Sequence, residues 1–395
     1  MKEGWEYKKL KEVGRTQTGT TPSKSIKSFY GGEIPFIRPA ELDIDGNGSI
    51  EYNSELKLTS EGALKSRTIK ANSTLMCCIG SVGKTGYTIK DVTCNQQINT
   101  ITPYDGYNGK FVYYALLAPS FQKEVIKIAN SAKATLAIIS KGKWEEMYIL
   151  VPPLSEQQSI VDYLDSAFAK IDAMKAYAEK ALNEAKALFQ ASLKEILEPK
   201  EGWEEKRIDE VCTIARGGSP RPIKDFITNS PEGLNWIKIG DTDMGGKYIY
   251  STKEKIKPEG LKKSRWVEVD EFLLSNSMSF GRPYILKTNG CIHDGWLVLR
   301  DYQKYLNIDF FYYVLSSENV QKQFRIKAQG STVSNLNTDR VASVIIYVPT
   351  IERQQSIVAT LDSLKSKVDR LQENYDKISQ ECDALKQAIL RQVFE

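Results

Sequence analysis

One stretch of the chain has the residues of a phosphate-binding loop but not their spacing. Residues 78–86 read CIGSVGKTG. A nucleotide-binding loop needs four residues between its glycines, followed by Lys and Ser or Thr, whereas only two residues separate Gly80 from Gly83. A related stretch at 280–283 reads FGRP. The pattern predicts a strand–turn–strand with a basic tip, and a single-chain nucleotide-binding enzyme is a disfavoured alternative.

Other catalytic patterns are missing from the sequence. His293 is the only histidine, so a His-based dyad cannot occur twice. There is no Asn-Pro-Pro-Tyr or Asp-Pro-Pro-Tyr run, which base methyltransferases use to hold an amino group, and no convincing paired-carboxylate-and-lysine nuclease core. The six cysteines have no CxxC spacing, which favours buried reduced thiols of a cytosolic protein. We therefore expect a recognition protein with no catalytic centre, metal or cofactor of its own.

The chain is two copies of one unit. EGWEYKKLKEV at Glu3 returns as EGWEEKRIDEV at Glu201, and QQSIV at Gln157 returns at Gln354. The offsets are 198 and 197 residues. This period is far longer than that of solenoid repeats, so it indicates a duplicated domain.

Each copy ends in a segment with the apolar spacing of a coiled-coil helix. The first predicted seam consists of Ile160, Leu164, Ala167, Ile171, Met174, Ala178, Ala181, Ala185 and Leu188. The second consists of Ile357, Leu361, Leu364, Val368, Leu371, Tyr375, Ile378, Cys382, Leu385 and Ile389. Seams of equal length in one chain favour antiparallel pairing with each other; pairing with helices of other subunits is the alternative.

The remaining residues predict β-rich domains with short helices. Strand-like runs occur at 32–42, 73–89 and 96–103, and two short helices are expected in each of 109–129 and 308–328. The framework is kept between the copies while the loops differ: GTTPSKS is set against GGSPRPI, and CNQQINT against CIHDGWL. One scaffold with different loop chemistry suggests two binding sites for related targets.

We therefore expect an α+β fold. Two β-rich domains, residues 1–154 and 201–351, lie at opposite ends of an antiparallel two-helix coiled coil formed by residues 155–200 and 352–395, with an approximate two-fold relation. Outside 155–200 and 352–395 the chain carries a net charge of +7, a mild sign of a polyanionic partner. No apolar run is long enough to span a membrane.

The chain resembles the specificity subunit of type I restriction–modification systems over essentially its whole length. VPPLSEQQSIVDYLD and VPTIERQQSIVATLD are similar to the openings of that family's helical spacers. GWEYKKLKEV and GWEEKRIDEV are similar to the starts of its target-recognition domains, and GTTPSK, GEIPFIRPAEL and CNQQINT to pieces within them. The second domain departs from this pattern with CIHDGWL.

The resemblance implies a non-catalytic subunit in a prokaryotic cytoplasm. It would hold two methyltransferase subunits, which methylate adenine in a bipartite double-stranded DNA site, and two restriction subunits can join to cut unmodified DNA. S-adenosylmethionine, ATP and Mg would belong to those partners. A helix pair of about 64 Å limits the separation of the half-sites to under two DNA turns of about 34 Å each. Shortening either helix by a heptad would then shift the gap and keep both half-sites.

Arginine and lysine suit guanine, asparagine and glutamine suit adenine, and Lys, Arg, Ser and Thr suit phosphates. In the first domain the candidates for DNA binding are Arg15, Gln17, Thr20, Ser23, Lys24, Arg38, Ser81, Lys84, Asn95 and Gln96. In the second they are Arg216, Ser219, Arg221, Lys224, Lys238, Asn276, Ser279, Arg282, His293 and Asp294. Lys84 corresponds to Arg282, and Asn95 to His293. The alternative is a scaffold whose two domains bind proteins.

Overall fold

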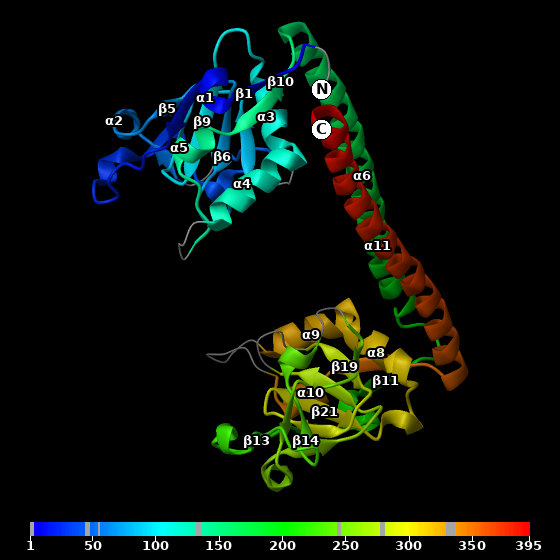
Figure 1. The fold of residues 1–395 in the computed structure, drawn as a ribbon. Coiled ribbons are helices and arrows are strands. Elements are labelled where there is room, and N and C mark those ends of the chain that lie inside the picture. Colours follow the sequence, from blue (N-terminus) through cyan, green and yellow to red (C-terminus); the bar gives the residue numbers. More distant parts are fainter. Residues whose placement is uncertain are drawn as a thin grey trace. The chain divides into compact units, whose positions relative to one another are not determined.

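The computed structural model describes residues 4–43, 48–53, 56–131, 136–242, 246–276, 281–328 and 336–395. The chain divides into two compact units. Unit 1 is Met1–Glu179 with Tyr375–Glu395, and unit 2 is Lys180–Asn374. Each unit therefore combines one β-rich domain with part of each of two long helices, α6 (Leu154–Ile196) and α11 (Ile351–Phe394) (Figure 1).

The domain of unit 1 is built on two four-stranded sheets, ordered β2-β9-β6-β7 and β4-β3-β8-β5, and on the antiparallel pair β1-β10. The strands are β1 (Glu6–Lys9), β2 (Gly14–Thr18), β3 (Tyr30–Ile37), β4 (Lys57–Leu58), β5 (Thr68–Ile69), β6 (Ser73–Cys77), β7 (Thr85–Thr88), β8 (Val92–Cys94), β9 (Ile98–Pro103) and β10 (Tyr148–Val151). The helices are α1 (Leu10–Val13), α2 (Ser60–Leu64), α3 (Gly109–Leu117), α4 (Pro119–Ser131) and α5 (Lys141–Glu145).

The domain of unit 2 repeats this plan with two five-stranded sheets, β12-β21-β18-β19-β15 and β13-β16-β14-β20-β17, and the pair β11-β22. Its strands are β11 (Glu204–Arg207), β12 (Thr213–Arg216), β13 (Ile227–Thr228), β14 (Leu234–Ile237), β15 (Tyr248–Ile249), β16 (Glu254–Ile256), β17 (Arg265–Val267), β18 (Phe272–Ser275), β19 (Pro283–Leu286), β20 (Gly290–Ile292), β21 (Trp296–Arg300) and β22 (Ile345–Val348). Its helices are α7 (Ile208–Val211), α8 (Ile308–Ser316), α9 (Glu318–Ala328) and α10 (Thr338–Ala342).

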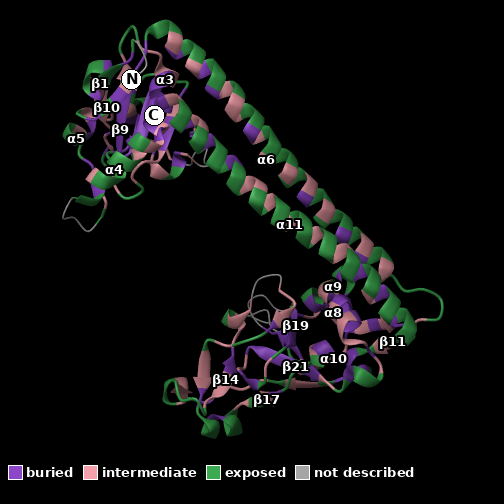
Figure 2. Ribbon diagram, turned by 45° about the vertical axis from the view of Figure 1, so that its right-hand side comes forward, coloured by how far each residue is buried: buried purple, intermediate pink, exposed green. Residues whose placement is uncertain are grey.

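The predicted short helices are confirmed as α3 with α4 and α8 with α9; α3 packs against β6 and β7, and α8 against β19. Phe111 on α3 is fully buried in the core of unit 1. In unit 2 the rings of Phe311 on α8 and Phe272 on β18 lie edge to face, with centroids 5.0 Å apart. Figure 2 shows buried residues concentrated inside each domain, while the long helices carry them along one stripe. The duplicated sequence thus folds into duplicated cores.

The predicted antiparallel pairing of the long helices is present in both units. In unit 1, the Lys386 amino group on α11 lies 2.5 Å from a carboxylate oxygen of Asp172 on α6. In unit 2, the Lys186 amino group donates to the side-chain oxygen of Gln372, 2.7 Å away. In each case a residue later on one helix contacts a residue earlier on the other.

The predicted seam of α6 is wrong in one of its two rows. Met174 is 60% exposed and Leu188 is 66% exposed, whereas Leu182 is 4% exposed. The inner row runs one residue later than predicted: Val161, Leu182 and Phe189 are buried, and Phe168 and Lys175 are half-buried. Many positions on both sides of the seam are alanine, lysine or partly polar. Two heptad phases of α6 therefore have similar apolar patterns, and the sequence does not distinguish them.

In the second seam, the predicted row that includes Leu361, Val368 and Cys382 is buried or half-buried, whereas the other row departs from the prediction at two leucines. Leu371 and Leu385 are 38% and 48% exposed. Gln372 and Lys386 occupy the inner positions instead. Polar residues at inner positions are satisfied by partners on α6, which a search for apolar periodicity does not detect.

The repeated QQSIV stretch attaches each long helix to its domain. Gln354 is fully buried; its side-chain oxygen accepts from the Asn307 backbone N–H (2.7 Å), and its side-chain nitrogen donates to the Pro349 carbonyl (2.9 Å). Gln157 makes the same two contacts, with the Asn108 N–H at 2.8 Å and the Pro152 carbonyl at 3.0 Å. The first glutamine of the motif therefore fixes the start of the helix against the N-terminus of α3 or α8.

The Leu-Asp pair that follows has a similar function. The Tyr114 hydroxyl donates to Asp165 at 2.5 Å, and the Tyr313 hydroxyl donates to Asp362 at 2.5 Å. Burial is the main cause that raises the pKa of both tyrosines, so the hydroxyls stay protonated and able to donate. Lys110 adds an ion pair with Asp165 at 2.7 Å.

The phosphate-loop look-alike is the hairpin β6–β7, as predicted: the Cys77 N–H donates to the Lys84 carbonyl at 2.8 Å. All six cysteines are buried and free. Burial raises the pKa of the Cys94 and Cys212 thiols to about 12. In the part of the chain that the structure describes, no helix is both long and apolar enough to cross a membrane.

Candidate nucleic-acid interface

Five of the ten residues predicted in the first domain line one hollow of about 450 Å³. It lies where the glycine loop of unit 1 (residues 18–24) meets the β8–β9 turn (residues 95–97) and the end of β3. Its lining includes the predicted Lys24, Arg38, Ser81, Asn95 and Gln96, together with Thr21, Leu56, Ile79 and Gln97. Segments far apart in the sequence are thus brought together in one concavity with many polar side chains.

Backbone contacts hold the glycine loop against the β8–β9 turn. The Gly19 N–H donates to the Ile98 carbonyl at 2.9 Å, and the Thr20 N–H donates to the Cys94 carbonyl at 2.9 Å. A Cβ atom at Gly19 would lie 2.1 Å from the Asn95 carbonyl oxygen, which no side chain permits. The approach of two backbones therefore requires glycine at this position.

Several predicted side chains of the first domain are occupied by internal partners. Asn95 is 7% exposed and its side chain donates to the Gln97 side chain at 2.9 Å. Arg38 pairs with Glu41, its Nε lying 3.0 Å from one carboxylate oxygen. The Lys84 amino group points to the Leu42 carbonyl, 3.4 Å away. Asn95 and Arg38 line the hollow, Lys84 does not, and all three are less available to DNA than predicted.

Other predicted residues of the first domain are accessible. Ser23, Lys24, Ser81 and Gln96 are exposed at or beside the hollow, and Gln96 accepts from the Thr21 hydroxyl. Arg15 and Gln17 lie instead on β2, opposite Thr102 and Thr100 of β9, and do not line this hollow. Sequence reasoning missed Thr21 and Gln97, although both belong to the quoted loops GTTPSKS and CNQQINT.

In the second domain the predicted residues gather around Asp294. Its carboxylate accepts from the Ser219 hydroxyl at 2.8 Å and pairs with Arg221 at 3.2 Å. Its carbonyl accepts from Asn276 at 2.8 Å and from Arg216 at 3.3 Å. The hydrogen bond from Ser219 is the main cause that lowers the pKa of Asp294. Asp294 therefore organises the loop that carries its neighbours.

His293 is part of the same turn. Its Nδ1 accepts from the Gly295 backbone N–H at 2.6 Å, and its Nε2 faces the Ile239 backbone N–H at 3.3 Å. Burial is the main cause that lowers the pKa of His293. Lys238 pairs with Glu254 at 2.6 Å. A neutral ring and a neutralised lysine give this part of the surface less positive charge than the sequence suggests.

Lys224 and Arg282 are exposed, and within the described ranges no carboxylate pairs with either. The predicted Ser279 lies outside the described residues. The backbone supports the correspondence of Lys84 with Arg282: the Ser275 N–H donates to the Arg282 carbonyl at 3.1 Å, as Cys77 does to Lys84. These observations place the candidates; which of them contact bases stays a prediction.

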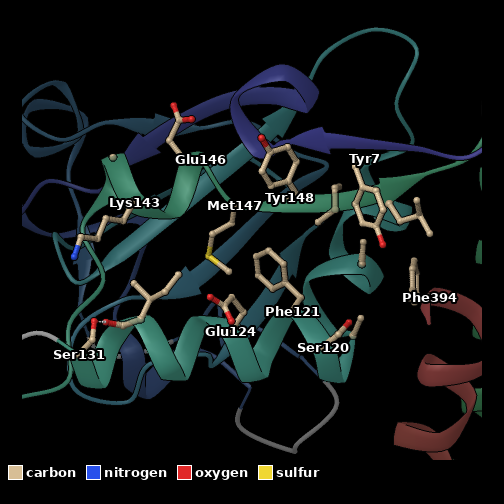
Figure 3. A pocket seen from close by; sticks show the side chains of 16 residues that line it. Tyr7, Ser120, Phe121, Glu124, Ser131, Lys143, Glu146, Met147, Tyr148 and Phe394 are labelled. Atoms are coloured by element: carbon tan, nitrogen blue, oxygen red, sulfur yellow. Dashed lines mark hydrogen bonds between the residues drawn. The ribbon is translucent and has the colours of Figure 1, made fainter.

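Unit 1 also contains a larger hollow, away from these loops. It has a volume of about 730 Å³ and lies between α4 and the β1–β10 pair. Figure 3 shows Phe121 on its α4 side and Met147 and Tyr148 on the other. None of the predicted DNA-binding residues lines it. Its aromatic and apolar side chains do not fit a phosphate backbone, so the smaller hollow is the candidate nucleic-acid interface.

Comparison with known proteins places the chain in a family. Residues 2–183 and 200–380 match the type I restriction modification DNA specificity domain. The chain belongs to this family. Each of the two matched segments contains one of the two interfaces described above.

Individual members of this specificity family are similar to the chain over different lengths. The HindI specificity subunit of Haemophilus influenzae is 34% identical over 149 residues, which cover 38% of this chain and 32% of that one. The MjaIX specificity subunit of Methanocaldococcus jannaschii is 26% identical over 57% of this chain and 56% of that one. The EcoBI specificity subunit of Escherichia coli is 22% identical over 91% of this chain and 79% of that one. The chain thus spans about a third and about half of the first two relatives.

Solved structures share the fold. A chain from a study of type I R-M system assembly and conformational transition matches with a TM-score of 0.79 and 19% identity, over 100% of this chain and 98% of that one. The HsdS subunit of Thermoanaerobacter tengcongensis matches with a TM-score of 0.58 and 18% identity, over 100% and 97%. The expected architecture, two β-rich recognition domains with long helices and an internal duplication, is therefore confirmed.

The described residues of this specificity-family chain contain no group of three or more His, Cys, Asp or Glu side chains that could hold a metal ion. The polar groups of the two interfaces are hydroxyls, amides, basic side chains and, in the second, the Asp294 carboxylate. These groups suit phosphates and base edges.

Proposed function

We propose that this chain is the DNA-recognition subunit of a type I restriction–modification complex. Each domain reads one half of a bipartite double-stranded DNA site. The chain itself has a recognition role, and the chemistry belongs to other subunits. The proposal rests on family membership and on the two interfaces.

The observation that carries this proposal is one backbone frame bearing two different sets of side chains. In both units a glycine loop packs on the turn that follows a buried strand: the Gly19 N–H donates to Ile98, and the Gly217 N–H donates to Trp296, each at 2.9 Å. The turn carries Asn95, Gln96 and Gln97 in one unit and His293, Asp294 and Gly295 in the other. The same frame with different polar groups suits two different half-sites.

Partners follow from the same proposal. The relatives are named as specificity subunits of type I restriction enzymes. We propose two methyltransferase subunits as partners, with two restriction subunits joining for cleavage of unmodified DNA. S-adenosylmethionine, ATP and Mg then bind to those subunits. Leu154, Tyr163, Met174, Tyr177 and Leu188 leave apolar surface on the outside of α6, which is available for helices of such partners.

The long helices set the length of the gap between the half-sites. α6 and α11 run 43 and 44 residues without a break. The buried glutamines and the tyrosine–aspartate bonds fix each domain to the helices that leave it. Because each domain is attached firmly to its helix, the length of the helices determines where each domain lies on the DNA. We therefore expect a constant gap.

The test uses the chain assembled with its methyltransferase partner. Methylated adenines are mapped across a genome for the wild type and for two variants: Lys24→Ala with Gln96→Ala in the first interface, and Lys224→Ala with Arg282→Ala in the second. We expect each variant to relax or lose one half-site and to leave the other unchanged. Relaxation of both half-sites by either variant, or an unmethylated genome with the wild type, would contradict the proposal.

A further inference from the structure

A second duplicated motif lies beside the glycine loop. Residues 61–67 read EGALKSR and residues 259–265 read EGLKKSR, an offset of 198. The three-residue run Lys-Ser-Arg is identical in the two copies, although the recognition loops differ. An identical basic motif in two domains with different recognition loops suggests a function that the two domains share.

In unit 1 the motif is bonded to the glycine loop. The Ser66 hydroxyl donates to the Thr20 carbonyl at 2.6 Å. One terminal nitrogen of Arg67 donates to the Thr18 carbonyl at 2.6 Å. Arg67 directly precedes β5, the edge strand of its sheet, and its side chain is exposed. The guanidinium is therefore held by one donor while its other N–H groups remain at the surface.

Unit 2 repeats this arrangement with different neighbours. The Ser264 hydroxyl donates to the Ile292 carbonyl at 3.0 Å. The Arg265 Nε donates at 2.6 Å to the carbonyl of Arg216, the residue that matches Thr18. Arg265 begins β17, again an edge strand, and is exposed. Both arginines thus donate to a backbone carbonyl at the start of the glycine loop. This hydrogen bond does not depend on the side chain of the acceptor residue.

Within the described part of the chain, the charge of these two arginines is not neutralised. Arg38, a predicted DNA contact, is paired with Glu41. Among the residues that the structure describes, no carboxylate lies within ion-pair distance of Arg67 or Arg265. An exposed guanidinium held at a fixed position with free N–H groups suits a phosphate, which accepts two parallel hydrogen bonds.

We propose that Arg67 and Arg265 are two equivalent, sequence-independent contacts to DNA phosphates, one in each domain. The inference rests on the proposed function in DNA recognition and assigns base contacts and phosphate contacts to different segments of each domain. The side chains of the glycine loop and the following turn select bases, while the Lys-Ser-Arg motif fixes the register of each domain on the backbone of the DNA. This explains why the motif is identical where the recognition loops are not.

The experiment measures DNA affinity of the assembled complex against salt concentration, for cognate DNA and for DNA lacking the site. The variants are Arg67→Gln and Arg265→Gln, which keep a donor for the loop carbonyl and remove the charge, and Arg67→Lys and Arg265→Lys, which keep the charge. Lys123→Ala on α4 and Lys322→Ala on α9, exposed lysines at matching positions, serve as charge-matched controls.

Each glutamine variant should weaken binding to both DNAs by the same factor and reduce the salt slope by about 0.9, and the double variant by about 1.8. The lysine variants and the controls should keep the wild-type slope, and the preference for the cognate site should not change. An unchanged slope in the glutamine variants overturns the inference. So does a changed base preference in one half-site, which would make the arginine a base reader. Wild-type complex that does not prefer cognate DNA would instead contradict the proposed function.

Discussion

At the scale of single residues, buried glutamine and asparagine side chains occur in two kinds of place. Gln157 and Gln354 are buried and bond backbone groups, and Asn95 and Asn276 are buried beside the recognition turns. The sequence shows that the glutamines are repeated, but for none of the four residues does it show whether the side chain faces the core or a ligand. Asparagine and glutamine suit both adenine and unsatisfied backbone groups, so residue type alone could not separate these cases.

The two glutamines of the second motif provide a matched test of the attachment. Gln354 is fully buried and bonded to Asn307 and Pro349, whereas its neighbour Gln355 is exposed. Gln354→Ala leaves a buried N–H and a carbonyl without partners, so it should lower the free energy of unfolding by about 1–3 kcal/mol. Gln355→Ala should change it by less than about 0.5 kcal/mol. Urea titration of the two purified variants measures both; equal effects would remove the attachment role.

His293 predicts a pH dependence of stability. Burial lowers its pKa in the folded state below the ordinary value of 6.5. The unfolded chain therefore binds the proton more readily, and the stabilising contribution, present above pH 6.5, decreases as the pH falls below it. The free energy of unfolding should fall less between about pH 7.5 and pH 5.5 in His293→Gln than in the wild type. Parallel curves for the two proteins would contradict this assignment.

At the scale of elements, the sequence predicted most of what the structure contains. The run of four- and three-residue spacings identified both long helices because no Gly or Pro interrupts them, and alternating strand-like runs located β6, β7 and β9. The spacing pattern did not identify which residues of α6 face α11. Ala181 and Leu188 fit one phase and Leu182 and Phe189 fit the next, and an alanine-rich helix leaves little difference in hydrophobicity to choose between them.

Two leucines of α6 test the corrected phase. Leu182 is 4% exposed and Leu188 is 66% exposed. Leu182→Ala should lower the free energy of unfolding by about 2–5 kcal/mol because it leaves a cavity between the helices. Leu188→Ala, the same change at the surface, should alter it by less than about 0.5 kcal/mol. A larger loss at Leu188 in the isolated chain would restore the phase predicted from the sequence.

At the scale of the whole molecule, the internal duplication was visible in the sequence and predicted the duplicated fold. The candidate interfaces were predicted only in part. The quoted loops GTTPSKS and CNQQINT do meet in one hollow, but the pairing of Arg38 with Glu41 and of Arg221 with Asp294 depends on contacts that the sequence does not show. The EGALKSR and EGLKKSR repeat was present in the sequence, and a comparison of the two copies at the 198-residue offset would have found it.

We propose that the long helices set the gap between the two half-sites, and one measurement tests this directly. One heptad is removed from α6 and the facing heptad from α11, and methylated adenines are mapped for the assembled complex. Seven residues of helix rise about 10 Å, so the gap should shorten by up to about three base pairs at 3.4 Å each, with both half-sites retained. Altered half-sites with an unchanged gap would contradict the account.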